Sequence, residues 1–168
     1  MRTAILFDFL VDKENKKIKV KRSFDALLPL VWQAWTDAEI LDQWWAPRPW
    51  KATTAGMDFR EGGHWLYVMR SPENNEAYWS LVNFMFIVHQ KSFASNCSFC
   101  NEKGEINPDF PSNQWEIYFT GSEDETLVDV TLSFEKLEHL EQMVQMGFKE
   151  GFTMGLDQLD EWLNQQKH

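Results

Sequence analysis

The C-terminal part of the chain, Leu137 to Asn164, is its longest amphipathic stretch. Apolar residues recur there at helical spacing and fall on one side of a helical wheel centred on Phe148. Gly147, Gly151 and Gly155 form a row along one border of this apolar stripe. Each glycine lowers helix propensity by ~1 kcal/mol relative to alanine. The row therefore favours close approach of a neighbouring segment, with empty space beside a sheet as the second interpretation.

Segments with a period of two, which is typical of strands, precede this helix. Ala4 to Val11 and Lys17 to Phe24 predict an N-terminal hairpin. After Pro49 the alternation returns and predicts six further strands: Trp50 to Phe59, His64 to Arg70, Tyr78 to Val88, Lys91 to Phe99, Gln114 to Thr120 and Thr126 to Phe134. The third of these is apolar on both faces, so its inner face stays open.

Two short helices are predicted between the hairpin and the later strands. Asp25 can cap a helix from Ala26 to Trp35, and Asp37 can cap one from Ala38 to Trp45. A proline-containing segment, Ala46 to Pro49, ends the second helix. The order of elements predicts the α+β class, with a curved antiparallel sheet wrapped around the long C-terminal helix. Such a concave arrangement leaves space that suits an apolar ligand.

Composition narrows the classes of function. A chain of 168 residues fits one domain, 1–168. Its nine Trp and thirteen Phe can fill a wide core or line a pocket. The net charge of −10 argues against binding to nucleic acid and to anionic membrane surfaces. The sequence shows no signal peptide and no apolar run of the ~18 residues that a membrane span needs, so we expect a cytoplasmic protein without membrane insertion.

The two cysteines, Cys97 and Cys100, form a single C-x-x-C in a predicted strand. Residues three apart in a strand point to opposite faces, so we expect two reduced thiols rather than a disulfide. A zinc site needs a second pair of ligands, which the sequence does not offer at suitable spacing. We therefore expect neither a metal nor another cofactor.

Short motifs distributed along the chain resemble a known family. The first is Phe24-Asp25-Ala26, and the last two are Met146-Gly147-Phe148-x-x-Gly151 and Leu156-Asp157-x-Leu159 in the final helix. Between them lie Val31-Trp32-x-Ala34-Trp35-Thr36-Asp37, Trp44-Trp45-x-Pro47, Phe59-Arg60-Glu61-Gly62-Gly63, Trp65-x-Tyr67-x-Met69-Arg70 and Asn107-Pro108-Asp109-Phe110-Pro111. In order and spacing these motifs are similar to proteins like the activator of heat-shock-protein-90 ATPase, in the START-like or SRPBCC superfamily. The resemblance runs from about Lys17 to Leu163.

The resemblance implies the helix-grip fold of the birch pollen allergen. It also implies several functions, because the superfamily contains carriers of hydrophobic ligands, polyketide cyclases and aromatases, and toxin-sequestering proteins. Eukaryotic chaperone activators carry this domain behind a separate domain that makes much of the chaperone contact. We expect no room for that second domain in 168 residues.

The leading hypothesis is a hydrophobic or aromatic small molecule bound between the sheet and the C-terminal helix. The candidate cavity walls are large apolar side chains on the inward parities: Trp35, Trp65, Tyr67, Met69, Trp79, Trp115, Phe119, Phe148 and Phe152. Arg22 is a candidate polar contact, because it shares the parity of the core-facing residues of its strand. It could bind an acidic group in the cavity, or escape to solvent at a bulge or strand end.

Two alternatives stay open. The acidic face of the last helix could meet a protein partner, as in a regulator of a chaperone ATPase. A cyclase-like enzyme could act through cavity shape plus one polar residue, such as Arg22 or Tyr67. No nucleophile elbow, phosphate loop or zinc helix occurs, and parity places His64 on the outer face. The sequence therefore favours a binding protein and names no catalytic residue.

Overall fold

The computed structural model describes residues 6–167. Within this range the chain forms one eight-stranded antiparallel sheet and four helices. The strands are β1 (Phe7–Asp12), β2 (Lys17–Phe24), β3 (Lys51–Met57), β4 (His64–Arg70), β5 (Ala77–Val88), β6 (Ser92–Cys100), β7 (Asn113–Gly121) and β8 (Thr126–Ser133). The helices are α1 (Leu28–Thr36), α2 (Ala38–Trp44), α3 (Leu137–Gln145) and α4 (Phe148–Gln165).

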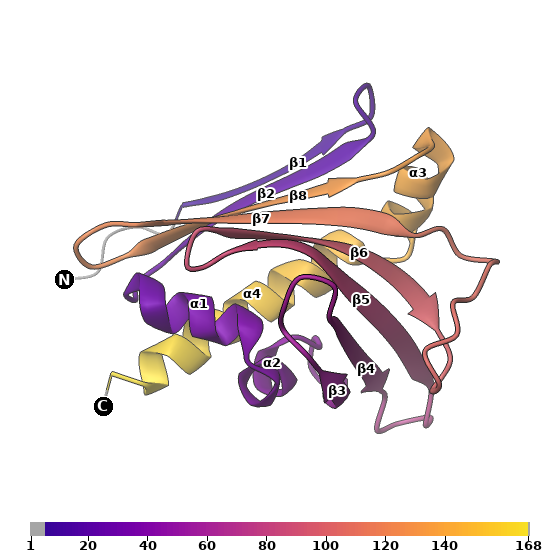
Figure 1. Ribbon diagram of the computed structural model, residues 1–168, viewed down its shortest axis with the longest axis horizontal. Helices are drawn as coiled ribbons and strands as arrows, with labels where there is room; N and C mark the ends of the chain where they lie inside the picture. Colours follow the sequence, from indigo (N-terminus) through magenta and orange to yellow (C-terminus); the bar gives the residue numbers. More distant parts are fainter. Residues whose placement is uncertain (1–5, 168) are drawn as a thin grey trace.

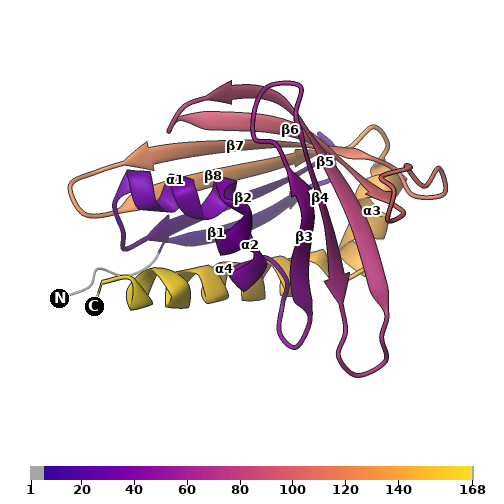
Figure 2. The same ribbon diagram turned by 60° about the horizontal axis from the view of Figure 1, so that its bottom comes forward.

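The strands follow the order β1-β2-β8-β7-β6-β5-β4-β3 across the sheet. The sheet curves around α4, and α1 and α2 lie on the same side of it (Figures 1 and 2). The predicted α+β helix-grip class is thus confirmed. The predicted strands are found with shifts of a few residues at their ends; residues 4 and 5 of the first one lie outside the described residues.

The alternation of apolar side chains explains which face of the sheet is buried. Val20, Val130 and Ile117 lie side by side on β2, β8 and β7 and are almost fully buried. The open question of β5 is settled by its buried side chains. Val82 and Phe84 point inward, and a bulge between Phe84 and Phe86 shifts the register beyond them.

Of the two N-caps predicted for the short helices, the structure contains one. The Asp37 carboxylate accepts hydrogen bonds from the backbone N–H groups of Glu39 and Ile40, at 2.9 and 3.4 Å, as predicted. The predicted Asp25 cap is wrong, because α1 begins at Leu28 and its N-cap Leu27 makes no side-chain bond. The Asp25 carboxylate instead accepts a 2.6 Å bond from the Lys167 ammonium at the far end of the chain.

The prediction of one unbroken helix from Leu137 to Asn164 is also wrong. The helix is interrupted at Met146 and Gly147, and α3 turns away from the axis of α4 (Figure 1). Gly147 has a φ of 90°, in the left-handed region that side chains with a Cβ disfavour. Its backbone N–H bonds to the Val144 carbonyl, which closes α3 in the manner of a C-terminal glycine cap.

The other two glycines of the row allow α4 to approach the segment that follows α2. A Cβ on Gly155 would lie 3.4 Å from the carbonyl oxygens of Trp44 and Trp45. A Cβ on Gly151 would lie 3.7 Å from Cγ of Pro47. Close packing is therefore confirmed at Gly155, whereas Gly151 meets Pro47 at an ordinary contact distance and also borders a cavity.

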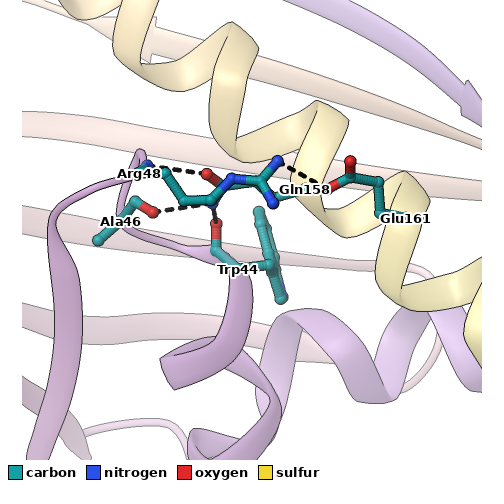
Figure 3. A network of polar contacts seen from close by, with 5 residues as sticks. All are labelled: Trp44, Ala46, Arg48, Gln158 and Glu161. Atoms are coloured by element: carbon teal, nitrogen blue, oxygen red, sulfur yellow. Dashed lines mark hydrogen bonds and ion pairs between the residues drawn. The ribbon is translucent and has the colours of Figure 1, made fainter.

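The buried side chain of Gln158 in α4 stabilises the contact between α4 and the segment that follows α2 (Figure 3). Its Nε2 donates to the carbonyl oxygens of Trp44 at 3.0 Å and Ala46 at 2.8 Å. Its Oε1 accepts a 2.8 Å bond from the backbone N–H of Arg48. Buried amide and carbonyl groups need such partners. These three hydrogen bonds, the Gln158 clamp, hold the C-terminal end of α2 against α4 and so determine the position of Trp45.

Candidate ligand cavity

A cavity of about 300 Å³ lies between the inward face of strands β4 to β7 and the junction of α3 with α4. This volume is at the lower end of the range of small-molecule pockets. The bend at Gly147 shapes it, since Gly147 and residues on both sides of it line the cavity.

Strand register assembles the floor of the cavity. Tyr67 of β4 pairs with Ser80 of β5, and Ser80 pairs with Phe99 of β6. One row along, Val82 pairs with Cys97, and Cys97 pairs with Asn113 of β7. Paired residues on neighbouring strands share a face of the sheet. Both rows line the cavity, together with Met69, Tyr78, Ser98 and Trp115.

Aromatic rings of α4 form the opposite wall. The rings of Phe148 and Phe152 are stacked, with centroids 5.1 Å apart and an interplanar angle of 17°. Trp115 meets both rings nearly edge-on, at 5.9 and 5.6 Å. Such edge-to-face contacts suit the charge distribution of aromatic rings. At the end of α3, Met143 and Met146 complete the wall, and methionine adapts readily to neighbours of different shape.

Trp45 connects the helical wall to the floor. Its ring contacts Trp65, Trp115 and Phe152 at centroid distances between 5.5 and 6.1 Å. Its indole N–H donates a 3.0 Å hydrogen bond to the hydroxyl of Tyr67. The polar atoms of both side chains are therefore satisfied inside an aromatic environment.

A smaller pocket of about 30 Å³ lies deeper in the core. It is lined by Trp35 and Trp65, and it shares Trp45, Val82, Cys97 and Trp115 with the larger cavity. The two spaces are thus separated by shared side chains rather than by a strand.

The polar groups of the wall are neutral and mostly bonded. The hydroxyl of Tyr67 accepts the Trp45 indole N–H, and the hydroxyls of Ser98 and Ser112 lie 2.6 Å apart. Burial raises the pKa of Tyr67 to about 12 and the pKa of the Cys97 thiol to about 12, because the charged forms would be desolvated. Both groups hold their protons at neutral pH, so neither is prepared to act as a base or nucleophile there.

The structure brings five of the predicted wall residues together around the large cavity: Tyr67, Met69, Trp115, Phe148 and Phe152. Trp35 and Trp65 line the deeper pocket. Phe119 lies in neither lining; it packs against Trp32 of α1, with ring centroids 5.0 Å apart.

Trp79 also lies outside both linings, because it follows the outward parity of β5. The Arg70 guanidinium lies 6.0 Å from its ring centroid, which is a cation–π contact. The sequence predicts Trp79 in the cavity wall because both faces of β5 are apolar, so the alternation does not show which face points inward. The neighbouring Tyr78 and Ser80 line the cavity instead.

Arg22 lies away from the cavity, between β2 and α4. Its side chain is 6% exposed, and a guanidinium nitrogen donates a 2.8 Å bond to the Asp157 carboxylate of α4. The guanidinium also lies over the rings of Phe7 and Phe24. The acidic group that this buried arginine meets is thus a side chain of the protein itself.

Sequence reasoning missed two notable wall residues, Trp45 and Asn113. Adjacent rings at Trp44 and Trp45 were a usable signal, since both cannot face the same side of a short helix. Asn113 lies just before the predicted strand Gln114 to Thr120, although it shares the parity of Trp115 two residues later. Within residues 6–167 no cluster of side chains is suited to hold a metal ion. No helix of this range has the length and apolar character required to span a membrane.

Comparison with known proteins places the chain in a family. Residues 25–164 match the family described as activator of Hsp90 ATPase homolog 1-like protein. No curated protein matches the sequence. Similar solved structures include protein Ms6760 from Mycobacterium smegmatis, with a TM-score of 0.86, 26% identity and coverage of 95% of this chain and 97% of that one.

A solution structure of a protein from Arthrobacter aurescens has a TM-score of 0.88 and 25% identity, and covers 94% of this chain and 91% of that one. CalU16 from Micromonospora echinospora shares the fold at a TM-score of 0.60 and 17% identity, with coverage of 97% and 87%. The family match covers most of the sequence, and these structures have the same architecture. The chain therefore belongs to the family of activator of Hsp90 ATPase homolog 1-like proteins and has the START-like, helix-grip fold.

Proposed function

We propose that the protein binds a hydrophobic or aromatic small molecule in the cavity between the sheet and the α3–α4 junction. The observation that carries the proposal is the cavity of about 300 Å³ walled by the rings of Trp45, Trp115, Phe148 and Phe152. A ligand in this space would make dispersion contacts with the surrounding rings. The START-like fold of the family supports the same function.

Burial of apolar surface supplies the affinity. Each Å² of ligand surface removed from water contributes ~25 cal/mol, before the costs of association. Ring faces and edges of the wall, such as the stacked pair Phe148 and Phe152, offer contacts to a planar ligand. Trp45 and Trp115 lie in the wall, so an occupying chromophore would quench their fluorescence.

The test is a titration with the neutral dye 1-N-phenylnaphthylamine, measured by dye emission and by tryptophan quenching. We expect saturable binding to the wild type and its loss in Val82→Phe, because the added ring would occupy the cavity that Val82 lines. Val130→Phe is the matched control, since Val130 lies in close-packed core outside the described cavities. Overpacking costs ~1–3 kcal/mol there, whereas the Val82 variant should fold with less loss.

Two results would refute the proposal. One is the absence of saturable binding by the folded wild type. The other is undiminished binding in a folded Val82→Phe variant, which would place the dye elsewhere on the protein. The roles of chaperone ATPase regulator and cyclase-like enzyme stay predictions; addition of the protein to a purified chaperone ATPase measures the first directly.

A further inference from the structure

Nineteen side chains and glycines line the large cavity, and among these described residues none is charged. A charged ligand would lose its hydration on entry without gaining an opposite charge, which is strongly unfavourable. The raised pKa values of Tyr67 and Cys97 also indicate that the site disfavours charge, because burial there disfavours the anionic forms of both groups. The wall therefore selects a neutral molecule.

One polar group of the wall has a fixed direction. The indole N–H of Trp115 donates a 2.6 Å hydrogen bond to Oδ1 of Asn113. An indole nitrogen can only donate, so this bond identifies the oxygen of the amide and leaves Nδ2 as the free end. Trp115 is held in turn by the rings of Phe148 and Phe152, which fixes the pair in place.

The Nδ2 group of Asn113 has two hydrogens to donate. Within residues 6–167, no acceptor of the protein takes either of them, although Asn113 is only 8% exposed and lines the cavity. This end of the amide is therefore available to donate to a molecule bound in the cavity. The hydroxyl of Tyr67 differs, because it already accepts the Trp45 indole N–H and can itself either donate or accept.

We infer that the preferred ligand is a neutral aromatic molecule carrying a hydrogen-bond acceptor, such as a carbonyl oxygen, which lies against Nδ2 of Asn113. The inference rests on the proposed function and names the ligand class of that cavity. Asn113 is the residue that determines specificity, and Trp115 is the residue that positions it. The rings supply most of the contact, and the amide distinguishes a ketone from a hydrocarbon of similar shape.

The test compares three probes of similar size: 2-acetonaphthone, 2-ethylnaphthalene and 2-naphthoate. Their dissociation constants are measured at pH 7 by displacement of 1-N-phenylnaphthylamine and by calorimetry. We expect the ketone to bind roughly three- to tenfold more tightly than the hydrocarbon, as the net contribution of one neutral hydrogen bond allows. The carboxylate should bind at least about tenfold more weakly than the ketone, because its charge is desolvated without a partner.

The informative variant is Asn113→Asp. It keeps an oxygen for the Trp115 indole but replaces the donor nitrogen by a second oxygen. We expect the ketone to lose its advantage over the hydrocarbon. Asn113→Leu provides a second route should the aspartate variant fail to fold. Asn96→Asp is the matched control: it makes the same exchange on β6, outside the linings of both described pockets, and should leave the preference for the ketone unchanged.

The outcomes separate the two proposals. If neither ketone nor hydrocarbon displaces the dye from the wild type, the proposed function fails and the inference fails with it. If both bind equally, or if the carboxylate binds as tightly as the ketone, the inference alone is overturned. The same holds if the preference persists in both Asn113 variants or disappears in Asn96→Asp.

Discussion

The side-chain amide of Gln158 donates a 2.8 Å hydrogen bond to the carbonyl oxygen of Ala46, which joins the middle of α4 to the segment after α2. Replacement by leucine would leave the carbonyl groups of Trp44 and Ala46 and the N–H of Arg48 without their partner. We expect Gln158→Leu to lower the free energy of unfolding by ~2–4 kcal/mol. Urea denaturation measures the change.

The control for this variant is Gln166, the residue that caps the C-terminus of the same helix. Gln166 is exposed and donates to the Trp162 carbonyl at 3.1 Å. Gln166→Leu should change stability by less than ~0.5 kcal/mol. Similar losses in the two variants would mean that helix propensity, rather than the clamp, dominates at Gln158.

The two glycines that face the α2 segment should respond differently to alanine. Gly151→Ala is expected to raise the free energy of unfolding by ~0.5–1 kcal/mol, because the new methyl group meets Pro47 at an ordinary 3.7 Å. Gly155→Ala should gain less or lose stability, since its methyl group would press on two carbonyl oxygens at 3.4 Å. Equal stabilisation of both variants in urea melts would contradict the close packing at Gly155.

The ion pair of Arg22 and Asp157 should behave as a semi-buried contact. Asp157→Ala is expected to cost ~1–2 kcal/mol, because it leaves a guanidinium that is 6% exposed without its acceptor. Glu161→Ala removes the exposed pair with Arg48 and should cost no more than ~0.5 kcal/mol. Thermal melts at low and moderate salt compare the two variants; indistinguishable melts would show that the Arg22 charge is solvated.

Alkaline pH should destabilise the protein through the cavity floor. In the folded state Tyr67 and Cys97 keep their protons until about pH 12, whereas their ordinary pKa values are 10.0 and 9.0. The unfolded chain therefore binds fewer protons above pH ~9, and the free energy of unfolding falls as pH rises. This contribution is fully present below pH ~9 and is lost toward pH 12.

The check for this prediction is a series of urea melts between pH 8 and pH 11. The double variant Tyr67→Phe/Cys97→Ala should show a flatter decline than the wild type, even though its stability at pH 8 is lower. Parallel curves for the two proteins would mean that neither group is desolvated in the folded state.

Sequence patterns were sufficient for the sheet and for most of its inner face, because alternation determines which side chains a half-buried strand presents. Sequence patterns were insufficient where the same apolar pattern is compatible with two structures. In β5 both parities are apolar, so Trp79 and its neighbour Tyr78 could not be told apart. At Gly147 an amphipathic stripe continues across a helix break, and only the left-handed backbone reveals the end of α3.

The cavity depends on pairings that a single sequence does not display. The floor row of Val82, Cys97 and Asn113 comes from three strands, and its composition is decided by register. Conversely, Arg22 could be identified as unusual from its parity, but its partner lies 135 positions away in the chain. Such distant partners are set by tertiary packing and not by local propensity.

The strand order also has a consequence for how the chain reaches its native state. From β3 to β8 each strand pairs with its successor along the chain, so these hairpins can form from local contacts. The N-terminal hairpin instead pairs with β8, so during synthesis one edge of β2 stays unpaired until nearly the whole sheet has left the ribosome. Alternating lysines at positions 17, 19 and 21 place charge along that waiting edge, and such charges oppose edge-to-edge association.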